Sequence, residues 1–257
     1  MHSLKEKIVF ITGASAGIGQ ACAQAFAAQG ARLLLVARRV ERLEKLAADL
    51  KAAFDTKSHV FALDVRDRKA VEKALAGLPA AWKDIEVLVN NAGLSRGLDK
   101  LQEGKSADWE EMIDTNVKGL LYVSRTVLPG MIARGKGHVI NIGSIAGREV
   151  YPAGNVYCAT KFAVGALTKG MRLDLNGTGV RVSTVDPGMM ETEFSVVRFH
   201  GDTERAAKFY QGYMPLTAED IADAVVYCAT RPPHVDIAEM LVLPTDQAST
   251  LMVDKKL

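Results

Sequence analysis

Short runs of apolar residues alternate with longer segments of helical periodicity along nearly the whole chain. Each apolar run is uninterrupted, which is typical of a strand buried on both faces. The expected strands are Ile8–Ile11, Arg32–Val36, His59–Leu63, Val87–Val89, His138–Ile142, Val180–Val185 and Leu241–Leu243. The expected helices are Gln20–Gln29, Val40–Ala53, Arg68–Leu78, Asp108–Arg134 and Asn155–Leu175. Because helical crossovers join parallel strands, this pattern predicts an α/β fold with a doubly wound parallel sheet of about seven strands and helices on both faces.

The alternation is interrupted only by an excursion at about residues 189–215, after the sixth expected strand. It mixes aromatic, charged and glycine residues without clear periodicity, and a segment of this length is usually a lid or binding loop. No flexible linker or internal repeat divides the 257 residues. We therefore expect one domain over residues 1–257, with this excursion beside the ligand crevice at the carboxyl ends of the strands.

Composition excludes several classes of protein. The 32 basic and 30 acidic residues give a net charge of +2, so nucleic acid is not an expected partner. Cys22, Cys158 and Cys228 lack metal-binding spacing, and we expect no metal and three buried, reduced thiols. No apolar run approaches the ~20 residues that cross a membrane, and no signal segment precedes the first strand. A cytoplasmic protein with no membrane partner is expected.

A glycine-rich turn follows the first expected strand in the sequence Thr12–Gly19. Gly13 permits a tight turn, Gly17 lets the backbone approach a pyrophosphate, and Gly19 allows the helix to pack closely on the strand. The first helix would present its N–H groups to the phosphates. The spacing is GxxxGxG, and its place in the first βα unit predicts dinucleotide binding.

Arg38 and Arg39 end the second expected strand, where an NAD-binding protein usually has a carboxylate for the ribose hydroxyls. Guanidinium groups bind phosphate in a bidentate manner, and two cations are unfavourable at the N-terminus of a helix. The pair therefore predicts that the cofactor carries a 2′-phosphate, as NADP(H) does.

Tyr157 and Lys161 are four residues apart in an expected helix, so their side chains share one face. A neighbouring ammonium would lower the pKa of the phenol and make Tyr157 a proton donor or acceptor. Ser144 follows the fifth expected strand, at the edge where ligands bind, and its hydroxyl would polarise a substrate carbonyl. These residues predict chemistry at a carbon–oxygen bond.

Together these motifs resemble the short-chain dehydrogenase/reductase family, whose fold is of the Rossmann type. The resemblance covers nearly the whole chain and rests on motifs that stand in the family's order: Thr12–Gly19, Asp64-Val65, Asn90–Gly93, Asn116, Ser144, Tyr157 with Lys161, and Pro187-Gly188. It implies hydride transfer to or from NADP(H), with Tyr157 exchanging the proton on oxygen and Ser144 steadying that oxygen.

The resemblance also implies roles for individual residues. Lys161 would hold the nicotinamide ribose, and Asn116 would support a water that relays protons through Lys161. Asp64 would contact the adenine, although a helix-capping role for Asp64 is also open. The implied cofactor site comprises Gly13, Ser15, Gly17, Ile18, Gly19, Arg38, Arg39, Asp64, Val65, Asn91, Ala92, Gly93, Tyr157, Lys161, Pro187, Gly188 and Thr192.

A narrower resemblance, to NADP-dependent serine and 3-hydroxy acid dehydrogenases of that family, concerns the segments VNNAGLSRGLDK, DWEEMIDTNVKGLLYVSRTVLPGM and ETEFSVVRFHGD. It implies oxidation of the β-hydroxyl of L-serine, L-allo-threonine or related acids, and reduction of malonic semialdehyde-type substrates in reverse. Such a substrate needs a cation for its carboxylate, and Arg198, or less favourably Arg148, is expected to supply it beside Ser144.

Two alternatives are compatible with the sequence. The same fold serves 3-oxoacyl carrier-protein reductases and broad carbonyl or steroid reductases, and a cofactor-sensing regulator without turnover would share the glycine loop. The intact set of Asn116, Ser144, Tyr157 and Lys161 argues against the regulator. The family resemblance also implies a homotetramer, for which Leu121, Val127, Leu167 and Met171 supply either subunit contacts or core.

Overall fold

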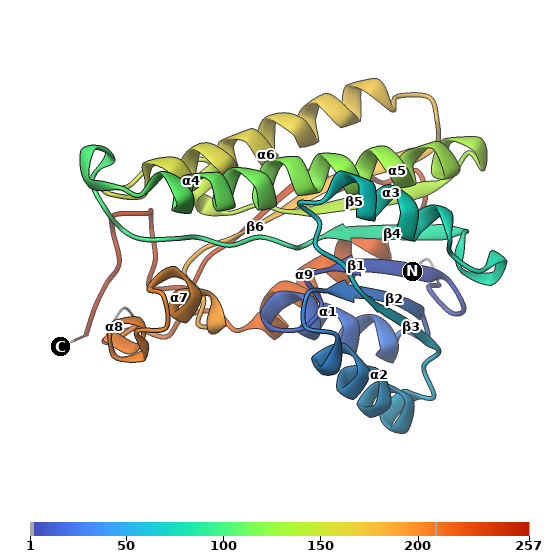
Figure 1. Cartoon of the computed structure of the whole chain (residues 1–257), viewed down its shortest axis with the longest axis horizontal. Coiled ribbons are helices and arrows are strands. Elements are labelled where there is room, and N and C mark those ends of the chain that lie inside the picture. The colour runs from blue at the N-terminus through green and yellow to red at the C-terminus, as the bar shows by residue number, and fades with distance from the viewer. Residues whose placement is uncertain (1–2, 209, 257) are drawn as a thin grey trace.

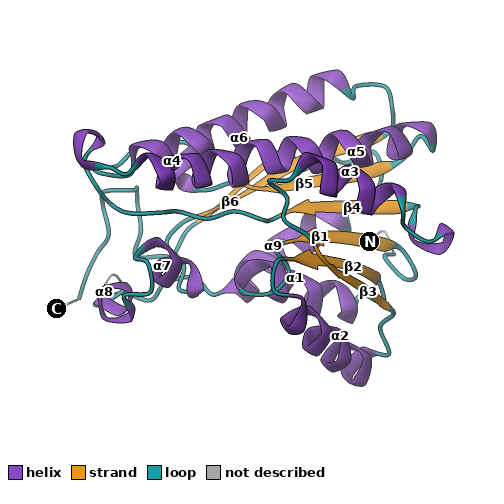
Figure 2. Cartoon of the chain, in the orientation of Figure 1, coloured by secondary structure: helices purple, strands orange, loops and turns teal. Residues whose placement is uncertain are grey.

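A seven-stranded, wholly parallel sheet forms the centre of the computed structural model, which describes residues 3–208 and 210–256 (Figure 2). The spatial order is β3-β2-β1-β4-β5-β6-β7, so the chain winds outward in one direction from β1 and in the other from β4. The strands are β1 (Ile8–Thr12), β2 (Arg32–Ala37), β3 (Ser58–Ala62), β4 (Ile85–Asn90), β5 (Gly137–Ile142), β6 (Val180–Pro187) and β7 (Glu239–Val242). The prediction of a doubly wound sheet is confirmed.

Helices cover both faces of this sheet (Figure 1). One face carries α1 (Gly17–Ala28), α2 (Val40–Phe54) and α9 (Ala218–Ala229), and the other carries α3 (Arg68–Ala76), α5 (Leu120–Ala133) and α6 (Asn155–Asp174). Alternate residues of each strand join the two cores: Val9 packs in one and Phe10 in the other. Burial on both faces explains why the strands are continuously apolar.

The helix expected over Asp108–Arg134 is interrupted by a π-helical turn. It consists of α4 (Ser106–Ile113), the π turn Asp114–Gly119 and α5. Single π turns inside α-helices are frequent at functional sites, and Asn116 lies in this one. Short 3₁₀ turns occur at Ala80–Trp82, Leu101–Glu103 and Ile145–Gly147.

The excursion after β6 contains two short helices, α7 (Glu193–Arg198) and α8 (Thr203–Lys208), which lie together at one end of the molecule (Figure 1). Phe209, within this excursion, is outside the described residues. The next helix, α9, was not predicted, although Thr217 and Asp220 form a capping box at its start.

The three thiols are buried and free, as expected. Within residues 3–208 and 210–256, no helix is long and apolar enough to span a bilayer. Of the residues considered for subunit contacts, Val127 belongs to the core, whereas Leu121 is exposed.

Candidate active site

A cavity of about 520 Å³ lies at the carboxyl edge of the sheet and extends from the glycine-rich turn to the excursion. Most of the residues predicted from the sequence line it: Gly13, Ser15, Gly17, Ile18, Arg38, Arg39, Asp64, Val65, Asn91, Ala92, Gly93, Ser144, Tyr157, Lys161, Pro187, Gly188, Thr192 and Arg198. Gly19, Asn116 and Arg148 are not among the lining residues.

The glycine-rich turn is shaped for close approach of a ligand. Gly13 and Gly17 have φ angles of 66° and 53°, in the left-handed region that favours glycine. A Cβ on Gly13 would lie 2.9 Å from the Cα of Ala92, and one on Gly19 would collide with the carbonyl of Gly13. The side chain of Asn91 fixes the turn by donating to the carbonyls of Thr12 at 2.9 Å and Gly13 at 3.1 Å. This open backbone beside the N-terminus of α1 fits a dinucleotide pyrophosphate.

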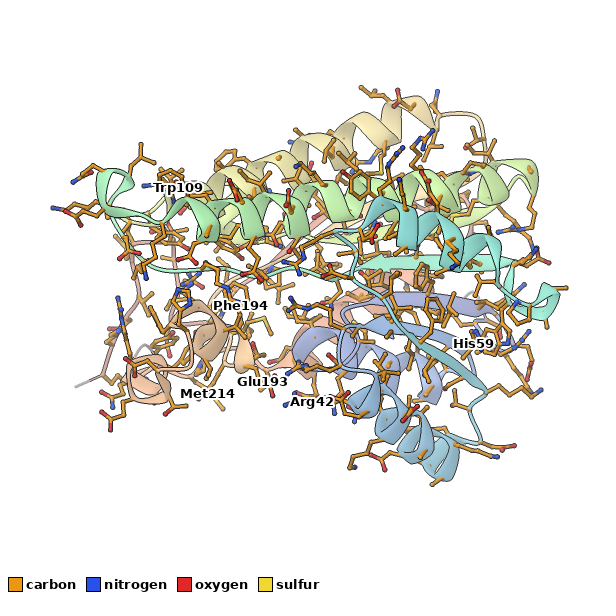
Figure 3. All side chains as sticks on the ribbon, viewed as in Figure 1. Arg42, His59, Trp109, Glu193, Phe194 and Met214 are labelled. Atoms are coloured by element: carbon orange, nitrogen blue, oxygen red, sulfur yellow. The ribbon has the colours of Figure 1, made fainter. Side chains whose placement is uncertain are left out.

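Four guanidinium groups, which we call the arginine cluster, gather near the ends of β2 and β3: Arg38, Arg39, Arg42 and Arg66. Arg39 donates to the Ser15 hydroxyl at 3.3 Å, so it reaches the glycine-rich turn. Both Arg39 and Arg42 bind the carboxylate of Glu193, which comes from α7. Figure 3 shows Arg42 and Glu193 near each other. Such a cluster fits a dianionic phosphate at this end of the cavity, beside the glycine-rich turn.

Asp64 lines this end of the cavity but is not a helix cap. Its Oδ2 accepts from the Arg66 guanidinium at 2.6 Å and its Oδ1 accepts from Arg66 Nε at 3.0 Å. Burial opposes ionisation of Asp64, but these contacts with Arg66 lower its pKa. The cap of α3 is Asp67, which accepts from the backbone N–H of Ala70 at 3.0 Å. The capping alternative for Asp64 is therefore wrong.

Helix α6 places Tyr157 and Lys161 on the cavity wall, as their spacing predicted. The Lys161 ammonium donates to the carbonyl of Ile142 at 2.9 Å, and Ser144 is hydrogen-bonded to the Tyr157 phenol. Burial lowers the pKa of Lys161 to about 8, while the charge of Asp186 raises it. Lys161 is therefore still largely an ammonium at neutral pH.

The pKa of the Tyr157 phenol behaves differently from the expectation. Burial raises it well above its usual value, the neighbouring Tyr151 raises it further, and the positive charge that opposes them is Arg198. Lys161 was expected to lower this pKa because the two residues share one helix face. Desolvation of the phenol is the larger effect, and it raises the pKa. The phenol is consequently neutral at pH 7 and suited to donate its proton.

Asn116 lies behind the wall formed by Gly93 and Leu94. Its amide donates to the Leu94 carbonyl at 2.8 Å and to the Thr160 hydroxyl at 3.0 Å, and its carbonyl oxygen accepts from the Leu94 N–H at 2.9 Å. The side chain therefore ties the π turn to α6 and to the loop after β4.

At the other end of the cavity, Arg198 of α7 is 6% exposed and is surrounded by aromatic rings. Its Cζ lies 5.4 Å from the ring centre of Tyr157 and 5.1 Å from that of Phe194, and it donates to the Tyr151 hydroxyl at 3.1 Å. A cation is thus held close to the Tyr157 phenol.

Comparison with known proteins agrees with this geometry. A family model described as short chain dehydrogenase matches residues 7–202. This chain belongs to the short-chain dehydrogenase family. It is 49% identical over 242 residues to the NADP-dependent 3-hydroxy acid dehydrogenase YdfG of Salmonella typhi, with 94% of this chain and 96% of that protein covered.

Two further relatives are similar over nearly their whole length. Sulfoacetaldehyde reductase 2 of Chromohalobacter salexigens is 46% identical, with 96% of this chain and 98% of the relative covered. The closed form of a serine dehydrogenase complexed with NADP⁺ superposes with a TM-score of 0.90 at 47% identity and covers 94% of this chain and 96% of that one. The chain is accordingly an oxidoreductase of this family.

In this short-chain dehydrogenase Arg148 does not reach the cavity. Its guanidinium is bound by Asp186, with Nε at 2.8 Å, and by Glu239 at 2.8 Å. The spacing from Ser144 suggested a substrate contact, but the 3₁₀ turn Ile145–Gly147 directs the side chain toward β6 and β7 instead. Arg148 is therefore removed from the candidate substrate residues.

The structure of the dehydrogenase also adds residues that sequence reasoning missed. Tyr151, Phe194 and Gln247 line the cavity, and Gln247 accepts from the backbone N–H of Met189 at 2.7 Å, which holds the loop after Gly188. Arg42 and Glu193 complete the contact between α2 and α7. Tyr151 lies in the loop just before the helix of Tyr157, which was the available signal for it, whereas nothing local marked Phe194 or Gln247.

Proposed function

We propose that this chain uses NADP(H) to oxidise the β-hydroxyl of small 3-hydroxy acids such as L-serine or L-allo-threonine, and to reduce malonic semialdehyde-type acids in the reverse direction. The observation that carries the proposal is the buried guanidinium of Arg198, placed 5.4 Å from the Tyr157 ring within one cavity. In a 3-hydroxy acid, one carbon separates the reacting carbinol from the carboxylate. A cation must therefore lie close to the catalytic phenol, as Arg198 does.

The cofactor assignment is supported by the other end of the cavity. The glycine-rich turn would hold the pyrophosphate of NADP(H), and Arg38 and Arg39, with Arg42 and Arg66 beside them, would hold its 2′-phosphate. Lys161 would hold the nicotinamide ribose, and the backbone from Pro187 to Gly188, with Thr192, would border the nicotinamide. The bound cofactor supplies the hydride donor or acceptor, and the protein supplies position and charge.

Two side chains act on the substrate oxygen, and Lys161 acts on one of them. In the reductive direction the neutral Tyr157 phenol donates its proton to that oxygen, while Ser144 steadies it by a hydrogen bond. In the oxidative direction Tyr157 must first lose its proton, and the phenolate oxygen then accepts the proton of the substrate hydroxyl. The Lys161 ammonium favours the ionised phenol that results from donation, and a water held near Asn116 would carry the replacement proton to Lys161.

Arg198 positions the substrate. A bidentate contact between its guanidinium and the carboxylate would fix the rotation of the acid, so that the carbinol carbon faces the cofactor. The aromatic rings around Arg198 exclude water, which strengthens this ion pair relative to one in solvent.

A second candidate function is the reduction of sulfoacetaldehyde. It is favoured by the 46% identity to sulfoacetaldehyde reductase 2 and by the same guanidinium, since a sulfonate offers oxygen acceptors to the Arg198 fork as a carboxylate does. Both candidates place a short anionic group on Arg198.

The variant Arg198→Met tests the role of the guanidinium. We expect kcat/KM for L-serine to fall by roughly 10²-fold or more, because a charge-assisted bidentate contact is lost, while kcat/KM for an uncharged secondary alcohol changes little. Arg205→Met, an exposed residue of α8, is the matched control and should behave like the wild type. Equal losses on the acid and the alcohol in Arg198→Met would contradict the proposed anchor.

A further inference from the structure

Asp186 is a buried carboxylate at the end of β6 for which the proposed reaction gives no role. It is 6% exposed and lies immediately before Pro187-Gly188, which border the cavity. The Thr184 hydroxyl donates to one of its oxygens at 2.6 Å and Arg148 Nε donates to the other at 2.8 Å. A buried carboxylate requires such partners to remain ionised.

The side chain of Asp186 lies on the face of the sheet that α6 covers. Side chains alternate between faces along a strand, so Val182, Thr184 and Asp186 share one face. Val182 belongs to the core into which Met171 of α6 packs. On the neighbouring strand β5, Asn141 is paired with Thr184 and donates to Thr168 of α6 at 2.9 Å. Thr184, and with it Asp186, therefore faces α6.

The contacts of Gly143 bring Asp186 next to the peptide that holds Lys161. The N–H of Gly143 donates to the carbonyl of Val185 at 2.8 Å, and a Cβ on Gly143 would collide with the Asp186 carboxylate. The carbonyl of Ile142, one residue earlier, accepts the hydrogen bond from the Lys161 ammonium at 2.9 Å. The carboxylate and the ammonium therefore lie against adjacent residues at the end of β5.

From this arrangement we propose that Asp186 is a positioning residue that keeps Lys161 in its ammonium form. Arg148, which the sequence assigned to substrate, acts instead through Asp186 by holding its carboxylate in place. The reaction needs that ammonium to favour the ionised Tyr157 phenol and to bind the nicotinamide ribose.

The surroundings of Lys161 support this role. Its own helix contributes the neutral phenol of Tyr157, and the end of β5 contributes the Ile142 carbonyl. The loop after β4 contributes Gly93, on which a Cβ would lie 3.8 Å from the ammonium nitrogen and 3.3 Å from the amide oxygen of Asn116. Burial among these groups lowers the pKa of Lys161, and the charge on β6, Asp186, opposes that shift. Removing this charge leaves desolvation unopposed.

The direct test is a ¹³C NMR titration of the Lys161 Cε signal, assigned by its absence in Lys161→Met. In Asp186→Asn, which preserves the shape of the side chain, the midpoint should fall by about one pH unit relative to the wild type. Glu239→Gln makes the same change in the other carboxylate bound to Arg148 and should leave the midpoint unchanged. An unchanged midpoint in Asp186→Asn would overturn the proposal.

The pH dependence of kcat provides a second readout. The fall of NADPH-dependent reduction at high pH should occur about one unit lower in Asp186→Asn than in the wild type or in Glu239→Gln. A uniform loss of kcat at every pH would indicate a merely structural role and would contradict the proposal. Because the NMR titration needs no substrate, a wrong substrate assignment would not affect it.

A double variant provides the same test if Asp186→Asn alone does not fold. In Asp186→Asn the guanidinium of Arg148 loses the carboxylate that it binds. Asp186→Asn combined with Arg148→Met removes both members of this ion pair. The same downward shift of the Lys161 midpoint is expected in the double variant. A midpoint at the wild-type value there would count against Asp186 even if the single variant did not fold.

Discussion

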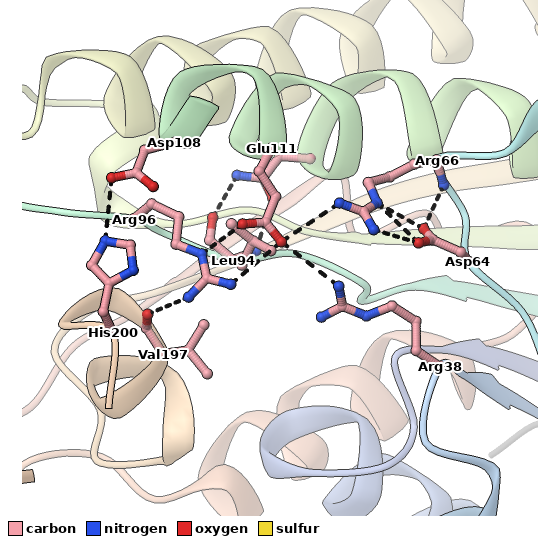
Figure 4. Close-up of polar contacts among 10 residues, drawn as sticks. Arg38, Asp64, Arg66, Leu94, Arg96, Asp108, Glu111, Val197 and His200 are labelled. Carbon is pink, nitrogen blue, oxygen red and sulfur yellow. Dashed lines mark hydrogen bonds and ion pairs between the residues drawn. The ribbon is translucent and has the colours of Figure 1, made fainter. Parts of the chain in front are cut away.

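The carboxylate of Glu193 accepts a hydrogen bond from the Arg42 guanidinium at 2.8 Å, and this contact joins the excursion helix α7 to the first turn of α2. Glu193 also binds Arg39 at 3.2 Å. The residues proposed to hold the 2′-phosphate therefore also hold the helix that carries Arg198. A second link between the same regions passes through Glu111, which binds Arg38 and Arg66 on one side and Arg96 on the other (Figure 4). Arg96 in turn donates to the carbonyl of Val197 in α7 at 2.7 Å.

The first prediction concerns Glu193. Its carboxylate would repel a phosphate bound by Arg39 and Arg42, so Glu193→Gln should tighten NADP⁺ binding. The side chains are roughly half exposed, which limits the effect to a two- to fivefold lower Kd. Isothermal titration calorimetry of NADP⁺ and NAD⁺ would measure it, with Glu191→Gln as the control. Weaker or unchanged NADP⁺ binding in Glu193→Gln would show that repulsion is not the dominant effect.

The second prediction concerns Arg39. Replacing it by alanine removes a charge-assisted contact to the 2′-phosphate, so KM for NADP⁺ should rise roughly 10- to 100-fold while KM for NAD⁺ changes little. Arg68→Ala, an exposed arginine that pairs with Glu72, provides the matched control for loss of charge. A parallel rise for both cofactors would mean that Arg39 acts on the shape of the turn and not on the phosphate.

The third prediction concerns Tyr157. Tyr157→Phe retains the ring packed against Phe194 and loses only the proton donor. We expect kcat to fall by about 10²- to 10⁴-fold, with the Kd for NADPH, measured by fluorescence, close to that of the wild type. Near-normal turnover in this variant would remove Tyr157 from its catalytic role.

The fourth prediction concerns stability. Burial lowers the pKa of His138 well below its usual value, with a further contribution from Arg181, and its ring contacts the Ser183 hydroxyl at 2.7 Å. The unfolded chain takes up a proton at this residue below about pH 6.5, but the folded protein does not. The free energy of unfolding should therefore fall as the pH drops below 6.5, by at most about 1.4 kcal/mol per pH unit from this group.

His138→Gln tests the origin of that loss, because it keeps a hydrogen-bonding group for Ser183 and removes the titration. Urea denaturation at pH 7.5 and 5.5 should give a smaller difference in the free energy of unfolding for the variant than for the wild type. If both proteins lost the same stability, the acid sensitivity would have to come from other groups.

The positions of the strands along the chain and the residues at the centre of the cavity could be predicted from the sequence because they depend on local signals. Continuous apolar runs gave the strands, and a fixed four-residue spacing placed Tyr157 and Lys161 on one face. The π turn at Asn116 could not be found in this way, since the apolar periodicity of the long helix continues through it. Helix α9 was overlooked even though its capping pair, Thr217 and Asp220, is local.

One prediction that failed, the substrate contact of Arg148, depended on contacts across the sheet. Its partners are 38 and 91 residues away, and only the adjacency of β5, β6 and β7 brings them together. A loop arginine beside a catalytic serine has no local feature that distinguishes a substrate ligand from a structural ion pair. The same is true of Gln247, which reaches the loop after Gly188 from the far end of the chain.

The most direct test of the account is a set of kcat/KM values measured with NADP⁺ and with NAD⁺. The substrates should include L-serine, L-allo-threonine and 3-hydroxypropanoate, with short uncharged secondary alcohols for comparison; sulfoacetaldehyde and a 3-oxoacyl thioester should be assayed with NADPH. We predict that kcat/KM for the 3-hydroxy acids with NADP⁺ exceeds that for the neutral alcohols by roughly a hundredfold or more, because only the acids carry a carboxylate that would pair with Arg198. Equal or better turnover of the neutral alcohols, turnover of the thioester but not of serine, or a preference for NAD⁺ would contradict it.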